Sequence, residues 1–152
     1  MSNSNPASSL QRAVIGAEWG SVIIYLCFIL VLTHMPVDSV KNAAFMQHSM
    51  MFWIDKLIQC ALYSVLVALL GCALFPLSKD PVKTIENISG LRLALLVAIV
   101  IGIAVFDEFT QPFFGRTKEL LDICANICGL LPGFCLFLVV NEVRHKFFNA
   151  RH

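Results

Sequence analysis

The sequence predicts an all-α membrane protein in which four transmembrane helices form a small bundle. The 152 residues are 58% hydrophobic and only 14% charged, whereas soluble domains are about 25% charged. Long apolar runs alternate with short polar segments, and four runs approach the roughly 20 residues that cross a bilayer. Four spans use most of these residues, so we expect no soluble domain among them. The net charge of +1 gives no reason to expect nucleic acid as a partner.

The first half of the chain contains two of the expected spans. A polar lead over residues 1–16 is expected to be flexible, and the first span follows at 17–35, ending before Pro36 because proline restrains the residue that precedes it. This apolar run is longer than the core of a signal peptide, and no small-residue cleavage site follows it, so we expect it to remain in the chain. Residues 37–54 are rich in Met and aromatic side chains, which is typical of an interfacial segment. The second span is expected at 54–77.

The third span, expected at 91–111, contains charged residues near its end. The apolar run 91–106 is only ~24 Å long as a helix, shorter than a hydrocarbon core of ~30 Å. We therefore expect the helix to continue to about Gln111, which places Asp107 and Glu108 about one turn inside the membrane. The fourth span is expected at 118–140 with Thr117 as its N-cap, and a basic tail at 144–152 follows it.

The distribution of basic residues predicts the orientation. Seven lie on the side of the two termini and the 78–90 turn, and four lie on the other side: Arg12, Lys79, Lys83, Arg92, Arg144, Lys146 and Arg151 against Lys41, Lys56, Arg116 and Lys118. The positive-inside rule then favours cytoplasmic termini. The Asp107–Asn126 hairpin would face the outer leaflet.

Cysteine and histidine give weaker signals. All six cysteines lie in apolar runs, where cysteine usually packs as a small hydrophobic residue. Cys124 and Cys128 are one helical turn apart, but no His accompanies them, so we favour packing over a disulfide or a metal site. His34 and His48 are interpreted as surface residues near the membrane interface.

Ionisable and amide side chains gather at one membrane level of the predicted bundle. Ionisable groups at such depth are costly and often functional. They come from the second span, from the end of the third, from the link that follows it and from the start of the fourth. The candidate binding residues are Asp55, Lys56, Gln59, Tyr63, Asp107, Glu108, Gln111, Arg116, Asp122 and Asn126.

Two interpretations of this set remain open. In the first, a structural clasp, Lys56 and Arg116 neutralise the acids, while Gln111 and Asn126 bond to backbone across helices. In the second, the set lines a site. Acids exceed bases by two, so the surplus is protonated or holds a cation. Gly129 and Gly133 continue the Asp122–Asn126 stripe and are expected to let another helix approach closely. In the link, Gly115 permits a positive φ.

Three motifs in this set resemble VanZ-like membrane proteins. They are Asp55-Lys56-x-x-Gln59-x-x-x-Tyr63, Asp107-Glu108-x-x-Gln111-x-x-x-Gly115-Arg116 and Asp122-x-x-x-Asn126-x-x-Gly129-x-x-x-Gly133, and Thr33-His34-Met35-Pro36 at the end of the first span adds to the match. The family usually has His at the position of Gln59, and Gln cannot shuttle a proton as His does. The resemblance implies a multi-pass protein of the bacterial cytoplasmic membrane, linked to resistance to the glycopeptide teicoplanin.

Three functions compete. We favour a non-enzymatic envelope factor that binds a membrane lipid, or a lipid-linked or amphiphilic envelope precursor, at the outer leaflet, with Arg116 and Lys56 meeting an anionic headgroup. The alternative is an intramembrane enzyme acting on a lipid phosphate or a lipid-linked sugar. Its base would be Asp107 or Glu108, and Asp122 and Asn126 would serve as ligands for Mg²⁺ or Ca²⁺. A proton-coupled carrier, which would need to oligomerise, is the third. The sequence identifies no cofactor and no nucleophile.

Overall fold

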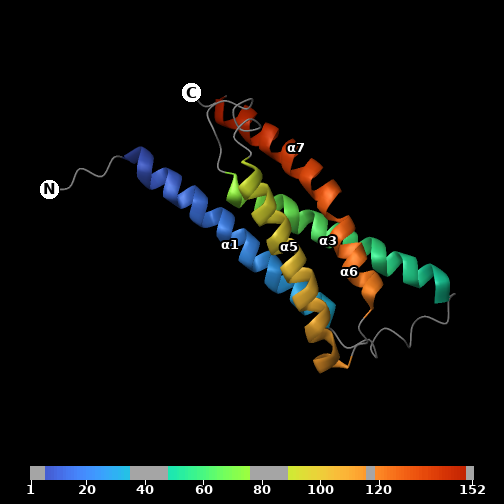
Figure 1. The fold of residues 1–152 in the computed structure, drawn as a ribbon. Coiled ribbons are helices and arrows are strands. Elements are labelled where there is room, and N and C mark those ends of the chain that lie inside the picture. The colour runs from blue at the N-terminus through green and yellow to red at the C-terminus, as the bar shows by residue number, and fades with distance from the viewer. Residues whose placement is uncertain (1–5, 35–47, 76–88, 116–118, 150–152) are drawn as a thin grey trace.

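The computed structural model describes residues 6–34, 48–75, 89–115 and 119–149, which are almost entirely helical (Figure 1). In chain order the elements are α1 (Pro6–His34), α3 (His48–Leu74), α5 (Gly90–Thr110), the short 3₁₀ helix η1 (Gln111–Phe114), α6 (Leu120–Cys128) and α7 (Leu130–Asn149). Among these described residues, four segments are long and apolar enough to cross a membrane: Ala13–His34, Trp53–Leu74, Gly90–Phe114 and Leu120–Lys146. The predicted all-α bundle of four spans is confirmed.

The helices extend further than the sequence pattern suggested. Residues 6–16, expected to be flexible, belong to α1, which starts with Pro6, a residue whose fixed φ suits a first helical turn. Residues 48–53, expected in the interfacial loop, belong to α3, whereas 35–47 lie outside the described residues. At the other end of the chain, α7 continues through the first part of the expected basic tail to Asn149. Once a helix has formed, adding further residues is easy, so hydropathy marks the membrane segment better than the helix ends.

The third span continues past Asp107, as its length required. α5 reaches Thr110, and η1 extends the coil to Phe114. Gly115 then adopts φ 78°, the positive value expected for this glycine, and its N–H donates to the carbonyl oxygens of Gln111 and Pro112. This tight end holds the acidic pair inside the bundle.

The central helix is α3, which packs against α1, α5, α6 and α7. Its buried side chains Tyr63, Leu66, Val67 and Leu70 form the middle of the core. Large apolar side chains of the surrounding helices, such as Ile24 of α1, point outward, as expected for surfaces that contact lipid. α1 begins and α7 ends at the same end of the bundle (Figure 1).

Glycines bring α7 close to α3. A Cβ at Gly133 would lie 2.6 Å from the carbonyl oxygen of Ser64, and a Cβ at Gly129 would lie 2.7 Å from that of Cys60. The expectation that this stripe admits a neighbouring helix is therefore confirmed. A turn at Gly129 separates α6 from α7, but the helical hydrogen bonds from Gly129 N–H to Ala125 and from Gly133 N–H to Gly129 are kept. Pro132 has no N–H for the carbonyl of residue 128, so one hydrogen bond of the helical series is missing here.

The six cysteines are all free thiols. Cys72 is buried, in agreement with a packing role, and Cys60 is partly buried. The other four, Cys27, Cys124, Cys128 and Cys135, are exposed on the outer faces of the helices, so they contribute little to the core.

Candidate functional site

The predicted polar residues converge on the interior of the bundle near the ends of α1 and α5 and the start of α6. We call this group, together with Thr33, His34 and Glu119, the polar cluster. Eight of the ten predicted residues are buried: Lys56, Gln59, Tyr63, Asp107, Glu108, Gln111, Asp122 and Asn126. The side chain of Asp55 is about half exposed at 47%, and Arg116 lies outside the described residues.

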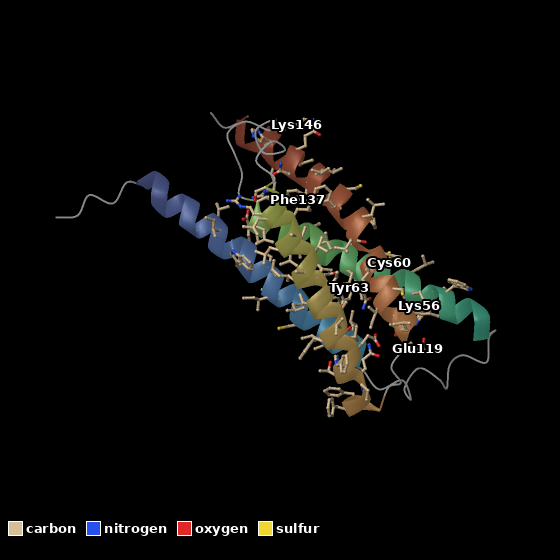
Figure 2. All side chains as sticks on the ribbon, viewed as in Figure 1. Lys56, Cys60, Tyr63, Glu119, Phe137 and Lys146 are labelled. Carbon is tan, nitrogen blue, oxygen red and sulfur yellow. The ribbon has the colours of Figure 1, made fainter. Side chains whose placement is uncertain are left out.

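Lys56 is the central cation in the described part of the polar cluster. Its ammonium group donates to Asp55 at 3.3 Å, to Glu119 at 3.0 Å and to Asp122 at a shorter distance. Figure 2 shows Lys56 of α3 beside Glu119 at the start of α6. The predicted neutralisation of acids by Lys56 is thus present. Glu119 was not among the predicted site residues, although its position three residues before Asp122, at the start of the fourth span, is a signal for it.

Glu108 connects the end of the third span with the start of the fourth. Gln111 Nε2 donates to Glu108 Oε1 at 2.9 Å, and the backbone N–H of Glu119 donates to Glu108 Oε2 at 3.3 Å. Gln111 was expected to bond to backbone of another helix, but the short 3₁₀ turn directs its amide to the carboxylate one turn earlier. One buried carboxylate therefore orients both η1 and the first residue before α6.

Asp107 joins α5 to α1. The hydroxyl of Thr33 donates to Asp107 Oδ1 at 2.7 Å, and His34 Nδ1 lies 3.6 Å from the same oxygen. Both carboxylates of the adjacent acidic pair thus have polar contacts, but with different elements. Asp107 contacts the first span, and Glu108 contacts the start of the fourth.

The interpretation of His34 as a surface residue is wrong. Only 11% of its side chain is exposed, and its Nε2 lies 2.8 Å from the hydroxyl of Thr110. Its Nδ1 donates to the carbonyl of Leu30 at 2.8 Å, because a carbonyl only accepts. The ring also packs edge-on against Phe114. The contact could have been predicted from the topology, since the end of the first span and the end of the third must lie at the same membrane level.

Four polar atoms of the polar cluster are buried without a hydrogen-bond partner in the described structure. They are Gln59 Oε1, the Tyr63 hydroxyl, Gln111 Oε1 and Asn126 Oδ1. A buried polar group left unpaired costs about 1–3 kcal/mol, and native interiors contain few of them. In the structural-clasp interpretation Asn126 bonds to backbone across helices, but its oxygen has no partner among the described residues. The carboxylates of Asp107 and Glu108 lie within electrostatic reach of the Tyr63 hydroxyl.

The described part of the polar cluster is strongly acidic. Five carboxylates, those of Asp55, Asp107, Glu108, Glu119 and Asp122, face Lys56 and the imidazole of His34. Three of the four unpartnered atoms are amide oxygens, which only accept hydrogen bonds. This interior therefore offers acceptors and negative charge. Over the described residues, no three His, Cys, Asp or Glu side chains are grouped in a way that would hold a metal ion.

No protein-family model, no curated protein and no solved structure matches this chain. The geometry described above is therefore the basis for any assignment of function. The fold and the hydropathy of its helices establish an integral membrane protein with four candidate spans, and its most distinctive feature is an acidic polar cluster enclosed between α1, α3, α5 and α6.

Proposed function

We propose that this chain is a VanZ-like protein of the bacterial cytoplasmic membrane that binds the polar part of a lipid-linked or amphiphilic envelope component in the polar cluster. In this proposal the termini are cytoplasmic and the polar cluster opens toward the outer leaflet. The three sequence motifs that resemble the family supply eight of the side chains buried in the polar cluster. They are consequently grouped in space as well as in order along the chain.

The observation that carries the proposal is the set of four buried atoms without partners. A structural clasp stabilises a bundle when its polar groups satisfy one another. Lys56 with Asp122 and Thr33 with Asp107 behave in this way. Gln59, Tyr63 and Asn126 do not, because each buries a polar atom that has no partner in the described structure. A ligand that supplies hydrogen bonds to these atoms accounts for their placement.

The chemistry of the unpartnered atoms favours a ligand rich in hydroxyl groups. Amide oxygens accept hydrogen bonds, and the surrounding carboxylates repel a bare phosphate. Lys56 was expected to meet an anionic headgroup, but it already contacts three carboxylates. A sugar, whose hydroxyls donate, therefore suits the described part of the polar cluster better than a phosphate does. In a lipid-linked sugar, the apolar chain would lie along the outward faces of the helices.

The binding test uses two asparagines as a matched pair. Asn126 and Asn141 are both on the last two helices, both are buried, and each has an Oδ1 atom without a partner, but only Asn126 belongs to the polar cluster. In lipid nanodiscs, we expect Asn126→Leu to weaken binding of a fluorescent polyprenyl-linked sugar by at least tenfold. Asn141→Leu should change it by less than twofold.

The polyprenyl phosphate without its sugar is the control ligand. It should bind the wild-type protein more weakly than the sugar-linked form, and Asn126→Leu should have little effect on it. Equal binding of the sugar-linked lipid by the wild type and Asn126→Leu would refute the proposed site. In a teicoplanin-susceptible bacterium, expression of the wild-type chain should raise survival in the antibiotic, and Asn126→Leu should remove that effect at equal protein level.

An intramembrane enzyme is a second candidate, and one observation favours it. The sequence pattern offered no histidine in the polar cluster, but the fold brings His34 within 3.6 Å of Asp107 and within 2.8 Å of the Thr110 hydroxyl. His34 Nε2 can accept a proton, because Nδ1 carries the hydrogen that is donated to Leu30. A base with an acidic neighbour is a common element of hydrolytic sites.

The enzyme hypothesis is tested by measuring hydrolysis of the same sugar-linked lipid. Release of free sugar by the wild type, lost in His34→Gln but retained in His48→Gln, would support it. Binding of the sugar-linked lipid without release of free sugar over many hours would contradict the enzyme hypothesis and favour the non-enzymatic envelope factor.

A further inference from the structure

A second polar site lies at the opposite end of the bundle from the polar cluster. A crevice of about 180 Å³ opens between α1, α3 and α7, and it is lined by Glu18, Ser21, Leu69, Cys72 and Arg144. In bulk liquid one water occupies about 30 Å³, so the crevice has room for a group as large as a phosphate. We call this feature the Arg144 crevice. It shares no residue with the polar cluster.

One of the two terminal nitrogens of the Arg144 guanidinium has no hydrogen-bond partner in the described structure. Its Nη2 donates to Glu18 Oε1 across the α1–α7 contact, whereas Nη1 is buried and has no partner among the residues that the structure describes. The side chain as a whole is 23% exposed, and that of Glu18 is 14% exposed. A guanidinium stays charged under all ordinary conditions and its N–H groups only donate. Nη1 therefore has no acceptor within the described ranges.

The surroundings of the Arg144 crevice add one further positive charge. Ser21 and Cys72 line the crevice together with Arg144, but the Ser21 hydroxyl donates to the carbonyl of Ala17 and the Cys72 thiol interacts with Arg144 itself. Arg92, near the start of α5, is exposed at the same end of the bundle, whereas Lys146, near the end of α7 in Figure 2, is paired with Glu142. Arginine presents a planar fork of N–H groups that matches the oxygens of phosphate. Phosphate groups of lipids lie at the level where membrane helices begin and end.

We propose that the Arg144 crevice binds the phosphate of an anionic lipid from the leaflet in which α1 begins and α7 ends. In this arrangement Arg144 Nη1 donates to a phosphate oxygen, while Nη2 keeps its contact with Glu18 and the Ser21 hydroxyl keeps its hydrogen bond to the carbonyl of Ala17. The lipid chains continue along the outward apolar side chains of α1. This site goes beyond the proposed function, since it lies at the other end of the bundle. Its ligand is an anionic phosphate, whereas the polar cluster is proposed to bind the hydroxyl groups of a sugar.

A purely structural ion pair is the competing explanation, because Glu18 and Arg144 also join α1 to α7. The two explanations differ in their prediction for Glu18. If the pair only joins helices, replacing either partner should have the same kind of effect. If Arg144 binds a phosphate, Glu18 competes with that phosphate for the guanidinium, and its removal should strengthen binding.

The experiment uses the full chain in phosphatidylcholine nanodiscs that contain increasing amounts of phosphatidylglycerol. Lipid that remains bound after extraction is counted by native mass spectrometry. We expect the wild type to retain phosphatidylglycerol at least fivefold over phosphatidylcholine. Glu18→Gln should raise this preference by threefold or more, and Arg144→Gln should reduce it to near unity. Lys146→Gln is the matched control, because Lys146 is an exposed cation paired with Glu142 at the same end, and it should change the preference by less than twofold.

Two further arms make the outcome decisive. If Arg144→Gln fails to fold, the Glu18→Gln, Arg144→Gln double variant removes the unpaired carboxylate and should also show no preference. Inorganic phosphate added at millimolar concentration distinguishes the source of the anion. Displacement of the lipid identifies phosphate itself as sufficient, and retention identifies the lipid as the ligand. Loss of preference in Glu18→Gln as well as in Arg144→Gln, or a wild type without preference, would overturn the proposal.

Discussion

Gly133 of α7 lies directly against the backbone of Ser64 in α3, so close that a Cβ on the glycine would be 2.6 Å from the Ser64 carbonyl oxygen. Real Cβ atoms do not approach a backbone atom this closely, so a methyl group here must push the two helices apart. This contact sets the distance between α3 and α7. Because the Asp122–Asn126 stripe continues along the same helical face, it also helps to place the polar cluster.

Gly133→Ala should therefore destabilise the protein by about 1–3 kcal/mol, the usual range for overpacking a tight interior. Gly102→Ala is the matched control, because Gly102 is also within a helix but has nothing within 4 Å of the added Cβ. That change should be neutral or slightly stabilising, since alanine is the better helix former. Unfolding midpoints in detergent measure the difference, and equal midpoints for the two variants would argue against the tight contact.

Lys56 gives a second stability prediction. Lys56→Met leaves the buried Asp122 without its cation, and removing one partner of a buried ion pair costs roughly 3–5 kcal/mol. Lys56→Met combined with Asp122→Leu removes both charges and should recover much of the loss. The single Asp122→Leu variant should be milder than Lys56→Met, because Lys56 keeps Glu119 and Asp55. A double variant no more stable than Lys56→Met would show that the pair does not hold the helices together.

The sequence pattern predicted the four spans and most of the buried polar set for a clear physical reason. Apolar length and the high cost of placing Asp107, Glu108 and Asp122 in a membrane are both visible in a linear sequence. The positions of these acids relative to the helix ends then fix their common level. Period and length do not reveal how far a helix continues beyond its apolar run, and α1 and α3 begin before the spans expected at 17–35 and 54–77.

Contacts between distant segments were harder to predict. His34 looked like a surface residue because its role depends on α1 meeting the end of α5, which no local pattern contains. The same holds for the Glu18–Arg144 pair, whose members are far apart in the chain. Unpartnered atoms such as Asn126 Oδ1 are also invisible in sequence, since the pattern shows only that a polar residue is present and not whether its hydrogen bonds are satisfied.

Thr33 provides a third prediction about stability. Its hydroxyl donates to the buried carboxylate of Asp107 at 2.7 Å, and this hydrogen bond joins the first span to the third. Thr33→Val keeps the shape of the side chain but removes the donor, and a hydrogen bond to a charged group contributes about 1.5–3 kcal/mol. Thr110→Val is the comparison, because it removes another hydrogen bond between α1 and α5, that of the Thr110 hydroxyl with His34 Nε2. Thr33→Val should lower the unfolding midpoint more than Thr110→Val does, because the partner of Thr33 is a buried carboxylate, and the reverse order would contradict the greater importance of the Thr33–Asp107 bond.

The two buried glutamines of the polar cluster should respond in opposite directions to the same change. Gln59 and Gln111 are both buried, and each has an Oε1 atom without a partner in the described structure. Gln111 also donates from Nε2 to the buried carboxylate of Glu108. Methionine has nearly the shape of glutamine and no strong polar atom, so each substitution isolates the polar contribution.

Gln59→Met should stabilise the ligand-free protein by roughly 1 kcal/mol, because it removes a buried acceptor that lacks a hydrogen bond. Gln111→Met should instead destabilise it by a similar or larger amount, since Glu108 then loses a donor. In the presence of the polyprenyl-linked sugar, Gln59→Met should bind more weakly than the wild type even though it is more stable. Higher stability together with weaker binding is expected when a residue serves ligand binding and lowers the stability of the ligand-free protein. If Gln59→Met were less stable and bound the sugar-linked lipid as well as the wild type does, Gln59 would belong to a structural clasp, and the site would have to exclude it.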